Sequence, residues 1–217
     1  FYALWWAYSL SVRLRRIERL SKVDSLTGLG SGDWLHTERW PAALRSGRPL
    51  GVVYLDLDHL KFTNDQLGHE AGDRYICTAA DALRQAVRRG VDEVFRSYQA
   101  GDEFVILIHG PLGDLHRCAE SLLRRLSERG VSASLGLAYT AVIEFVPARA
   151  ELRLAAEAAC RQAKMRGGGC AILADPDLGT PAHEDSGARC WPSMGLTPPT
   201  TQSQIAGPTI ARGQVGP

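Results

Sequence analysis

The sequence lacks several features that mark whole classes of protein. Its five cysteines lie far apart, form no CxxC pair and are odd in number, which argues against a disulfide framework or a zinc site and suits a reducing cytosol. Lysine and arginine (25) nearly balance aspartate and glutamate (24), for a net charge of +1. No overall field therefore draws the chain to nucleic acid, which is not an expected partner, and local groups must hold any anionic ligand.

Long hydrophobic runs and internal repeats are also missing. The stretch "FYALWWAYSL" at residues 1–10 is too short to span a bilayer by itself. The basic stretch "RLRRIERLSK" follows at once, and two interpretations of residues 1–22 stay open. They are either the cytoplasmic end of a transmembrane helix, which would tether the protein to the inner face of the cell membrane, or an amphipathic linker helix.

The two ends of the chain are expected to differ from its middle. Because the chain begins without methionine, we expect an upstream sensor domain that acts through residues 1–22. Residues 175–217 are rich in Pro, Gly, Ser and Thr without an apolar period, which predicts a disordered tail. Residues 23–174 then form one globular domain, in keeping with a composition that is 45% hydrophobic and 23% charged.

Strand and helix patterns alternate within this domain. Apolar and β-branched runs predict strands at residues 50–58, 91–98, 102–110, 131–139 and 169–175. Apolar residues at helical spacing predict helices at residues 71–89, 112–130 and 151–167. Because residues 91–110 form a hairpin, the sheet cannot be all parallel. We expect an α/β sandwich with a mixed, mainly antiparallel, five-stranded sheet flanked by helices.

Acidic side chains collect at the end of the first strand. Asp56 and Asp58 lie two apart, so the period of a strand places both on one face. If the hairpin tip with Asp102 lies beside them, like charges raise one another's pKa unless a cation lies between them. Mg²⁺ would suit such a site and would bring phosphate ligands with it. The plainer alternative is that solvated aspartates favour turns.

Five motifs, in order, resemble those of the GGDEF family, the diguanylate cyclases. "DSLTGL" (24–29) resembles DxLTGL, and "DLDHLKFTNDQLGHEAGD" (56–73) resembles DxDxFKxxND..GH..GD with Leu60 in place of Phe. "AGDEF" (100–104) stands where GGDEF belongs, "SASLGLA" (132–138) resembles an SxG strand, and "AACRQAKMRGGG" (158–169) resembles ALYxAKxxGRN. The resemblance covers residues 24–173 and implies a fold of the nucleotide-cyclase and polymerase-palm type.

The resemblance also implies a metal site and catalytic residues. Mg²⁺ or Mn²⁺ would be held by Asp56, the Leu57 carbonyl, Asp102 and Glu103. Catalysis would depend on Asp102, Glu103 and Lys61, with Glu103 helping to deprotonate the attacking 3′-hydroxyl or holding a second ion. Two domains, each loaded with GTP, would face each other as a homodimer and form cyclic di-GMP and two pyrophosphates.

The implied substrate-binding residues are Asn64, Asp73, Lys61, Lys164, Leu60 and Gly101. Asn64 and Asp73 would pair with the guanine edge. Lys61 and Lys164 would face the phosphates, and Gly101 would let the nucleotide approach the hairpin backbone closely.

Three further departures from the family pattern bear on activity. Ala100 replaces the first motif glycine and adds a Cβ beside the nucleotide. If Arg96 is the family's arginine before the glycines, two residues are inserted in the hairpin, an even number that preserves the strand faces. Gly168 stands in place of a phosphate-binding arginine, and Arg166 is near enough in sequence to replace it.

The insertion places Arg89 and Asp92 where many family members have RxxD, an inhibitory site for cyclic di-GMP. A surface salt bridge is the alternative interpretation. Two hypotheses remain for the whole domain: an active diguanylate cyclase, or a catalytically inactive GGDEF-type domain that binds GTP or cyclic di-GMP as a sensor. The retained carboxylates favour the first, whereas Ala100, the hairpin insertion and Gly168 favour the second.

Overall fold

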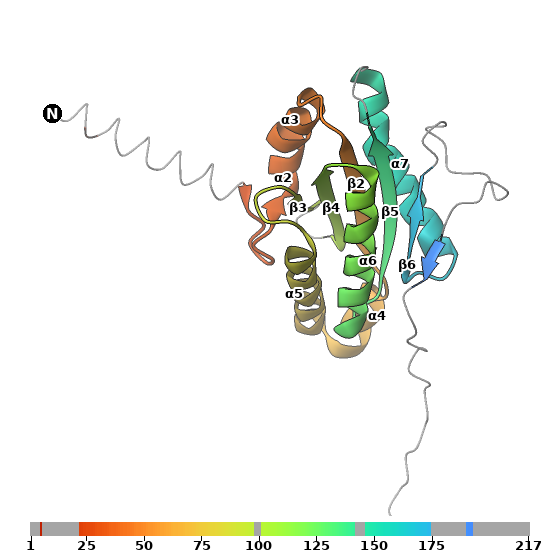
Figure 1. The fold of residues 1–217 in the computed structure, drawn as a ribbon. Coiled ribbons are helices and arrows are strands. Elements are labelled where there is room, and N and C mark those ends of the chain that lie inside the picture. Colours follow the sequence, from red (N-terminus) through yellow and green to blue (C-terminus); the bar gives the residue numbers. More distant parts are fainter. Residues whose placement is uncertain (1–4, 6–21, 98–100, 142–145, 175–189, 193–217) are drawn as a thin grey trace, which may run out of the picture.

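The computed structural model describes residue 5 and residues 22–97, 101–141, 146–174 and 190–192. Its centre is a seven-stranded sheet in the order β1-β3-β4-β2-β5-β6-β7 (Figure 1). The strands are β1 (Gly30–Ser31), β2 (Leu50–Leu57), β3 (Glu93–Arg96), β4 (Glu103–His109), β5 (Ala133–Thr140), β6 (Cys170–Leu173) and β7 (Cys190–Pro192). The β1–β3 and β5–β6 pairs are parallel, and the other neighbours are antiparallel. The mixed, mainly antiparallel sheet is confirmed, with short strands β1 and β7 added at the edges of the five predicted strands.

Helices cover both faces of this sheet. They are α2 (Gly32–Trp34), the π-helix η1 (Leu35–Arg39), α3 (Trp40–Arg45), α4 (Leu60–Leu67), α5 (His69–Ala86), α6 (Leu112–Glu128) and α7 (Val146–Met165). α5 and α6 pack on one face, whereas η1, α3 and α7 pack on the other. The α/β sandwich is thus confirmed.

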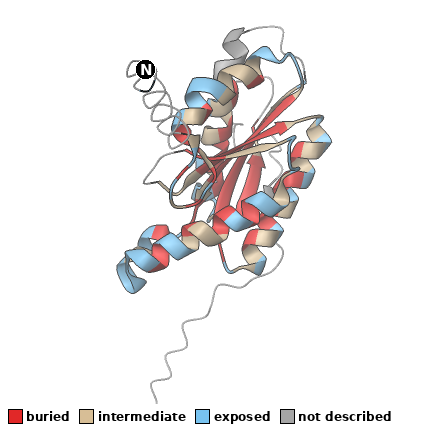
Figure 2. Ribbon diagram, turned by 90° about the vertical axis from the view of Figure 1, so that its left-hand side faces the viewer, coloured by how far each residue is buried: buried red, intermediate tan, exposed pale blue. Residues whose placement is uncertain are grey.

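β2 is the central strand of the core. Val53 and Leu55 pack toward α5 and α6, whereas Val52 and Tyr54 pack toward η1, α3 and α7. Buried residues fill the strands, and the helices expose their outer surfaces (Figure 2). Because both faces of β2 are covered, its sequence is a continuous apolar run rather than an alternating one.

Antiparallel register brings distant segments together at one end of β2. Asp56 lies opposite Glu103 of β4 on one side and opposite Ser134 of β5 on the other. α4 and α5 follow β2 directly in the chain, with His59 in the left-handed region at a φ of 64° before α4 begins. The polar segment after β2 is therefore helical, and it lies beside the strand ends that carry the acidic residues.

Part of the predicted organisation lies outside the described residues. This holds for residues 1–4 and 6–21, on which the two interpretations of the N-terminal segment depend, and for residues 175–189 and 193–217. Cys190–Pro192, within the predicted disordered tail, form β7 against β6. Main-chain hydrogen bonds to an open strand edge need no apolar pattern, so composition did not indicate this strand. Among the described residues, no helix has the length and apolarity that crossing a membrane requires.

Candidate active site

Asp56 is a carboxylate held at the edge of the core. Its side chain is 19% exposed, and β4 and β5 flank it on either side. Burial raises the pKa of Asp56 to about 6, and the negative charges of Asp102 and Glu103 add to this effect while Lys164 opposes it. Asp102 and Glu103 therefore lie close enough to repel the Asp56 carboxylate, an effect that the sequence had indicated for Asp102.

Lys164 supplies the positive charge next to this cluster. Its Nζ lies 2.6 Å from Asp56 Oδ1. Although burial alone lowers the pKa of Lys164, the contact with Asp56 raises it overall. Lys164 is in the last turn of α7, and α7 lies against β5 because Gly136 has no side chain: a Cβ there would fall 1.8 Å from the Ala156 carbonyl oxygen.

The hairpin tip brings the other two carboxylates to β2. The Leu57 N–H donates to the Asp102 carbonyl at 3.1 Å, and the Ser97 N–H donates to the Glu103 carbonyl at 2.8 Å. Leu57 is buried and is the last residue of β2. Its backbone therefore lies at the same strand end as the acidic side chains. Among the described residues, neither the Asp102 nor the Glu103 carboxylate forms an ion pair, which leaves both available to a ligand.

Arg96 supports this hairpin through the backbone of Gly101. Its Nε donates to the Gly101 carbonyl at 3.0 Å, and its Nη1 lies 3.4 Å from both carboxylate oxygens of Asp24. Burial would raise the pKa of Asp24, but hydrogen bonds from Thr27 and the charge of Arg96 lower it overall. The DSLTGL motif thus holds Arg96 beneath the hairpin. Residues 98–100, with Ala100 and the predicted insertion, lie outside the described residues.

The predicted guanine-binding residues meet where α4 contacts α5. The side chain of Asn64 lies against Gly72, where a Cβ would fall 1.9 Å from Asn64 Oδ1. Asp73 follows Gly72 and is exposed. The glycine of the "AGD" sequence thus makes room for the Asn64 amide beside Asp73, which brings both predicted residues to one place.

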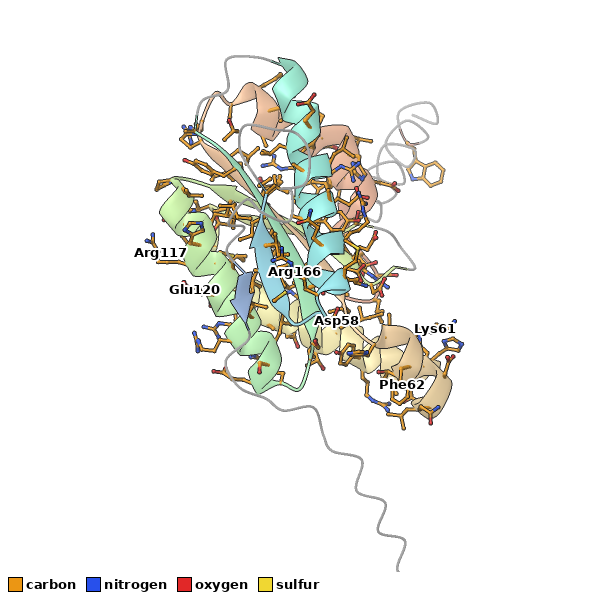
Figure 3. All side chains as sticks on the ribbon, turned by 90° about the vertical axis from the view of Figure 1, so that its right-hand side faces the viewer. Asp58, Lys61, Phe62, Arg117, Glu120 and Arg166 are labelled. Carbon is orange, nitrogen blue, oxygen red and sulfur yellow. The ribbon has the colours of Figure 1, made fainter. Side chains whose placement is uncertain are left out.

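Leu60 and Lys61 differ in exposure although they are neighbours on α4. Leu60 packs in the core that α5 and α6 cover, so its side chain supports α4 rather than lining an open surface. Lys61 and Phe62 project outward from α4 (Figure 3). In the view of Figure 3, Asp58 lies between Lys61 and Arg166. Lys61 is exposed and free to reach a phosphate from the α4 side.

The structure does not bring Arg89 and Asp92 together as an ion pair. Asp92 is bound instead by Arg88, whose Nε and Nη2 donate to its two oxygens at 2.8 Å and 2.7 Å, and the Asp92 side chain is only 2% exposed. Arg89 is exposed. It lines a cavity of about 390 Å³ between α5 and α6, together with Asp81, Arg84, Gln85, Val87 and Arg125.

The acidic cluster fits a hard divalent cation that also takes ligands from a substrate. No group of three His, Cys, Asp or Glu residues in the described ranges converges tightly enough to hold a metal alone. Mg²⁺ commonly takes one or two carboxylates and completes its shell with water and phosphate oxygens. A half-buried carboxylate with a raised pKa beside two further acidic residues fits such an ion.

Sequence reasoning missed the residues that surround Asp58. Ser132, Ser134 and Gly169 all donate to its carboxylate. The serines of "SASLGLA" and the glycines of "RGGG" were visible as parts of motifs, but nothing in the sequence indicated that they share an acceptor in another strand.

Comparisons with known proteins agree with this geometry. Residues 21–170 match the family described as "Diguanylate cyclase, GGDEF domain". The chain is 32% identical over 164 residues to the diguanylate cyclase DgcS of Shewanella oneidensis, covering 71% of this chain and 53% of that protein. It is 34% identical over 177 residues to MucR of Pseudomonas aeruginosa, a bifunctional diguanylate cyclase/cyclic di-GMP phosphodiesterase, covering 74% of this chain and 24% of MucR.

Solved structures of GGDEF domains are also similar to this chain. The GGDEF domain of YfiN from Pseudomonas aeruginosa has a TM-score of 0.61 at 29% identity, covering 70% of this chain and 94% of that one. A microbial GGDEF domain studied for its interaction with cyclic di-GMP has a TM-score of 0.61 at 27% identity, covering 70% of this chain and 99% of that one. The chain spans about half the length of DgcS and about a quarter of MucR. The chain belongs to the GGDEF domain family of diguanylate cyclases.

Proposed function

We propose that this domain is an active diguanylate cyclase that condenses two GTP molecules into cyclic di-GMP and two pyrophosphates. One observation carries the proposal: Asp56, Asp102 and Glu103 converge at the buried end of β2 with Lys164 as the nearby cation. A cluster of like charges is unfavourable unless a cation joins it. Its retention in a chain of this family supports a catalytic role.

The substrate and metal are assigned to the residues described above. Asp56, the Leu57 carbonyl, Asp102 and Glu103 would hold Mg²⁺ or Mn²⁺, which would neutralise the charge of the phosphates. Asn64 and Asp73 bind the guanine edge, and this assignment is supported by the Asn64 side chain lying against Gly72, the residue before Asp73. Lys61, Lys164 and Gly101 are assigned to the phosphates and ribose, whereas Leu60 would contribute to binding by supporting α4 from the core.

In the reaction, each 3′-oxygen forms a bond to the α-phosphorus of the other GTP while the bond from that phosphorus to the β-phosphate oxygen breaks. The two hydroxyl protons leave and two pyrophosphates are released. Glu103 lies opposite Asp56 in the sheet and is the group assigned to assist proton removal. Lys164 and Lys61 stabilise the negative charge that builds up on the phosphates.

Because each GTP must meet a second one, the active form is a homodimer. We assign residues 1–22 to the connection with an upstream sensor domain, which would set the pairing of two domains at the cytoplasmic face of the membrane or in the cytoplasm. A fragment beginning at Val23 that dimerised and turned over as well as the full chain would contradict this assignment.

A second function, nucleotide sensing without turnover, is favoured by one observation. Gly168, where the family pattern has a phosphate-binding arginine, has a φ of +76° and no space for a side chain, since a Cβ would fall 2.6 Å from Asp58 Oδ2. Loss of that arginine weakens the hold on the phosphates. The chain would then bind GTP or cyclic di-GMP and signal through its partner domains.

Incubation of the purified dimer with GTP and Mg²⁺ separates the two functions. Cyclic di-GMP that forms with the wild-type chain and not with Asp102→Ala supports the cyclase. Tight GTP binding without product supports the sensor. Asp114→Ala is a matched control, because Asp114 is an acidic residue of α6 paired with Arg88 and should leave product formation unchanged.

Cyclic di-GMP would also bind as an inhibitor at Arg89. The assignment is supported by the exposure of Arg89 and by its cavity with Arg84 and Arg125, since arginine binds phosphate through paired donors. Asp92 would contribute indirectly, because its carboxylate is already held by Arg88.

A further inference from the structure

Asp58, two residues beyond Asp56, is a buried carboxylate that the metal site does not need. It is 7% exposed, and it accepts hydrogen bonds from Ser132 Oγ at 2.7 Å, from Ser134 Oγ at 2.8 Å and from the Gly169 N–H at 2.9 Å. Hydrogen bonds to a carboxylate are about twice as strong as those between neutral groups. With three donors from this chain, Asp58 is stabilised without a cation.

The backbone of Asp58 is also tied to its neighbours. Its N–H donates to the Ser132 carbonyl at 2.9 Å, and the Tyr75 hydroxyl donates to its carbonyl at 3.2 Å. The Ser132 N–H in turn donates to the Tyr75 hydroxyl at 2.8 Å. The end of β2, the start of β5 and the middle of α5 are therefore joined at this residue.

A run of glycines closes around the same carboxylate. Gly167, Gly168 and Gly169 have φ values of 105°, 76° and 61°, in the left-handed region that glycine adopts without strain. A Cβ on Gly168 would lie 2.6 Å from Asp58 Oδ2. The backbone thus approaches Asp58 more closely than any other residue type would allow, and the Gly169 N–H ties the loop to it.

This loop begins where α7 ends, immediately after the turn that carries Lys164. The Gly167 N–H donates to the Lys164 carbonyl at 3.0 Å, and the Gly168 N–H donates to the Ala163 carbonyl at 3.0 Å. The position of the loop on Asp58 therefore determines where the last turn of α7 lies relative to β2. Lys164 reaches Asp56 from that turn.

We propose that Asp58 is a positioning residue, which holds Lys164 against Asp56 by anchoring the Gly167–Gly169 loop and binds neither the divalent cation nor the nucleotide. The proposal deepens the proposed function and rests on it for its consequence in catalysis. It also accounts for Gly168: the anchored loop leaves no space for an arginine there.

A double-mutant cycle tests whether Asp58 acts through Lys164. Asp58→Asn removes the negative charge and leaves one acceptor oxygen where the carboxylate has two, so the hydrogen bond from the Gly169 N–H becomes a weaker neutral one when the amide oxygen faces it and is lost when the amide nitrogen does. Affinity for a non-hydrolysable GTP analogue with Mg²⁺ should fall about 10-fold to 100-fold in the wild-type background, since small misplacements have large effects. In the Lys164→Ala background the further loss should be under about threefold, because the two residues are coupled. Equal losses in both backgrounds would overturn the proposal.

Binding of Mn²⁺, followed by electron paramagnetic resonance, separates positioning from metal ligation. Asp58→Asn should bind Mn²⁺ with the affinity of the wild-type chain, whereas Asp56→Asn should not. If folded Asp58→Asn loses Mn²⁺ binding, Asp58 is a ligand and the proposal is wrong. If Asp58→Asn fails to fold, Ser134→Ala replaces it, because this variant removes one hydrogen-bond donor to Asp58. Its loss of nucleotide affinity should be smaller and should likewise shrink in the Lys164→Ala background.

A third measurement does not depend on nucleotide binding. If the chain binds no nucleotide, the proposed function is wrong, but the positioning of Lys164 by Asp58 can still be tested. The ¹⁵N signal of the Lys164 ammonium should show slowed hydrogen exchange in the wild-type chain because of its contact with Asp56. The signal should broaden or vanish in Asp58→Asn. An unchanged signal in that variant would show that Asp58 does not position Lys164.

Discussion

Lys164 Nζ lies 2.6 Å from Asp56 Oδ1, which joins the last turn of α7 to the end of β2. This ammonium supplies positive charge to the cluster of Asp56, Asp102 and Glu103. Under the proposed function, the same contact puts Lys164 beside the cation and phosphates assigned to Asp56. Under the proposed function, the same lysine therefore stabilises both the Asp56 carboxylate and the phosphates of the substrate.

Replacement of Lys164 by methionine should keep the volume of the side chain and remove its charge. GTP-analogue affinity should fall about 10-fold to 100-fold, in the range of a lost charge-assisted hydrogen bond, as measured by calorimetry with Mg²⁺ present. Arg161→Met is the matched control, because Arg161 is on the same helix and pairs with the partly exposed Glu157. A loss of affinity of similar size in both variants would mean that charge on α7, rather than the contact with Asp56, is what matters.

The raised pKa of Asp56 makes stability depend on pH in a defined direction. In the folded chain Asp56 keeps its proton up to a pKa of about 6, against an ordinary value of 3.8. Between these values the folded state binds more protons than the unfolded state, so stability falls as pH rises. The fall should total about 3 kcal/mol. Urea unfolding in EDTA from pH 3.5 to 7 measures it.

Asp56→Asn isolates this effect, because the other titrating groups are the same in both chains. The free energy of unfolding of the variant, relative to the wild-type chain, should rise across this window by about the same 3 kcal/mol. A difference that does not change with pH would show that Asp56 has an ordinary pKa in the folded chain. Mn²⁺ binding to the wild-type chain should weaken by up to about tenfold per pH unit below 6, since the proton competes with the metal.

Gly72→Ala tests the placement of Asn64. The added methyl would fall 1.9 Å from Asn64 Oδ1, and because that atom ends a flexible side chain, the chain should fold with the Asn64 amide displaced. Affinity for GTP should fall about 10-fold or more, the effect of losing a guanine contact, with little preference for GTP over ATP remaining. Gly113→Ala is the control, since its Cβ would lie at an ordinary 3.6 Å from Arg117. GTP selectivity that survives in Gly72→Ala would contradict the role of Asn64.

Long periodic segments of the fold could be predicted from the sequence. β2, the β3–β4 hairpin, α5 and α6 follow their apolar spacing because each buries a continuous face. α2, η1 and α3 are short and present too few turns for a period to appear. α4 resembles a polar loop, since Leu60 is its only buried residue.

The candidate site was predictable only where a motif fixed a residue's position. The convergence of Asp56, Asp102 and Glu103 follows from the motifs and from the hairpin. The role of Asp58 does not, because its donors come from residues 132–169, and pairing across such separations is invisible to local pattern. For Asp92, the sequence pattern favoured Arg89 as its partner, whereas the turn at residues 88–92, closed by the Asp92 N–H donating to the Arg88 carbonyl, gives the carboxylate to Arg88.

Gly136→Ala tests the contact that places α7. The new Cβ would meet the Ala156 carbonyl oxygen at 1.8 Å and the Cys160 nitrogen at 2.3 Å, and neither backbone atom can move alone. Destabilisation of about 3 kcal/mol or more is expected from such overpacking, as measured by urea unfolding. Gly51→Ala on β2 meets only the Leu115 side chain, at 3.1 Å, and should lose less. Equal losses would mean that α7 does not depend on Gly136.

Arg88 and Arg89 are adjacent arginines with opposite predicted effects. Arg88 binds both oxygens of Asp92, whose side chain is 2% exposed, so Arg88→Ala leaves that carboxylate with only the Arg88 and His109 backbone N–H donors and should lower the free energy of unfolding by about 2 kcal/mol. Arg89 is exposed, so Arg89→Ala should change stability by less than about 0.5 kcal/mol. If cyclic di-GMP inhibits the chain, Arg89→Ala should raise the inhibitory concentration at least about tenfold, the effect of losing a phosphate-binding arginine. Inhibition unchanged in Arg89→Ala and relieved in a folded Arg88→Ala would instead assign the inhibitor to the Arg88–Asp92 pair.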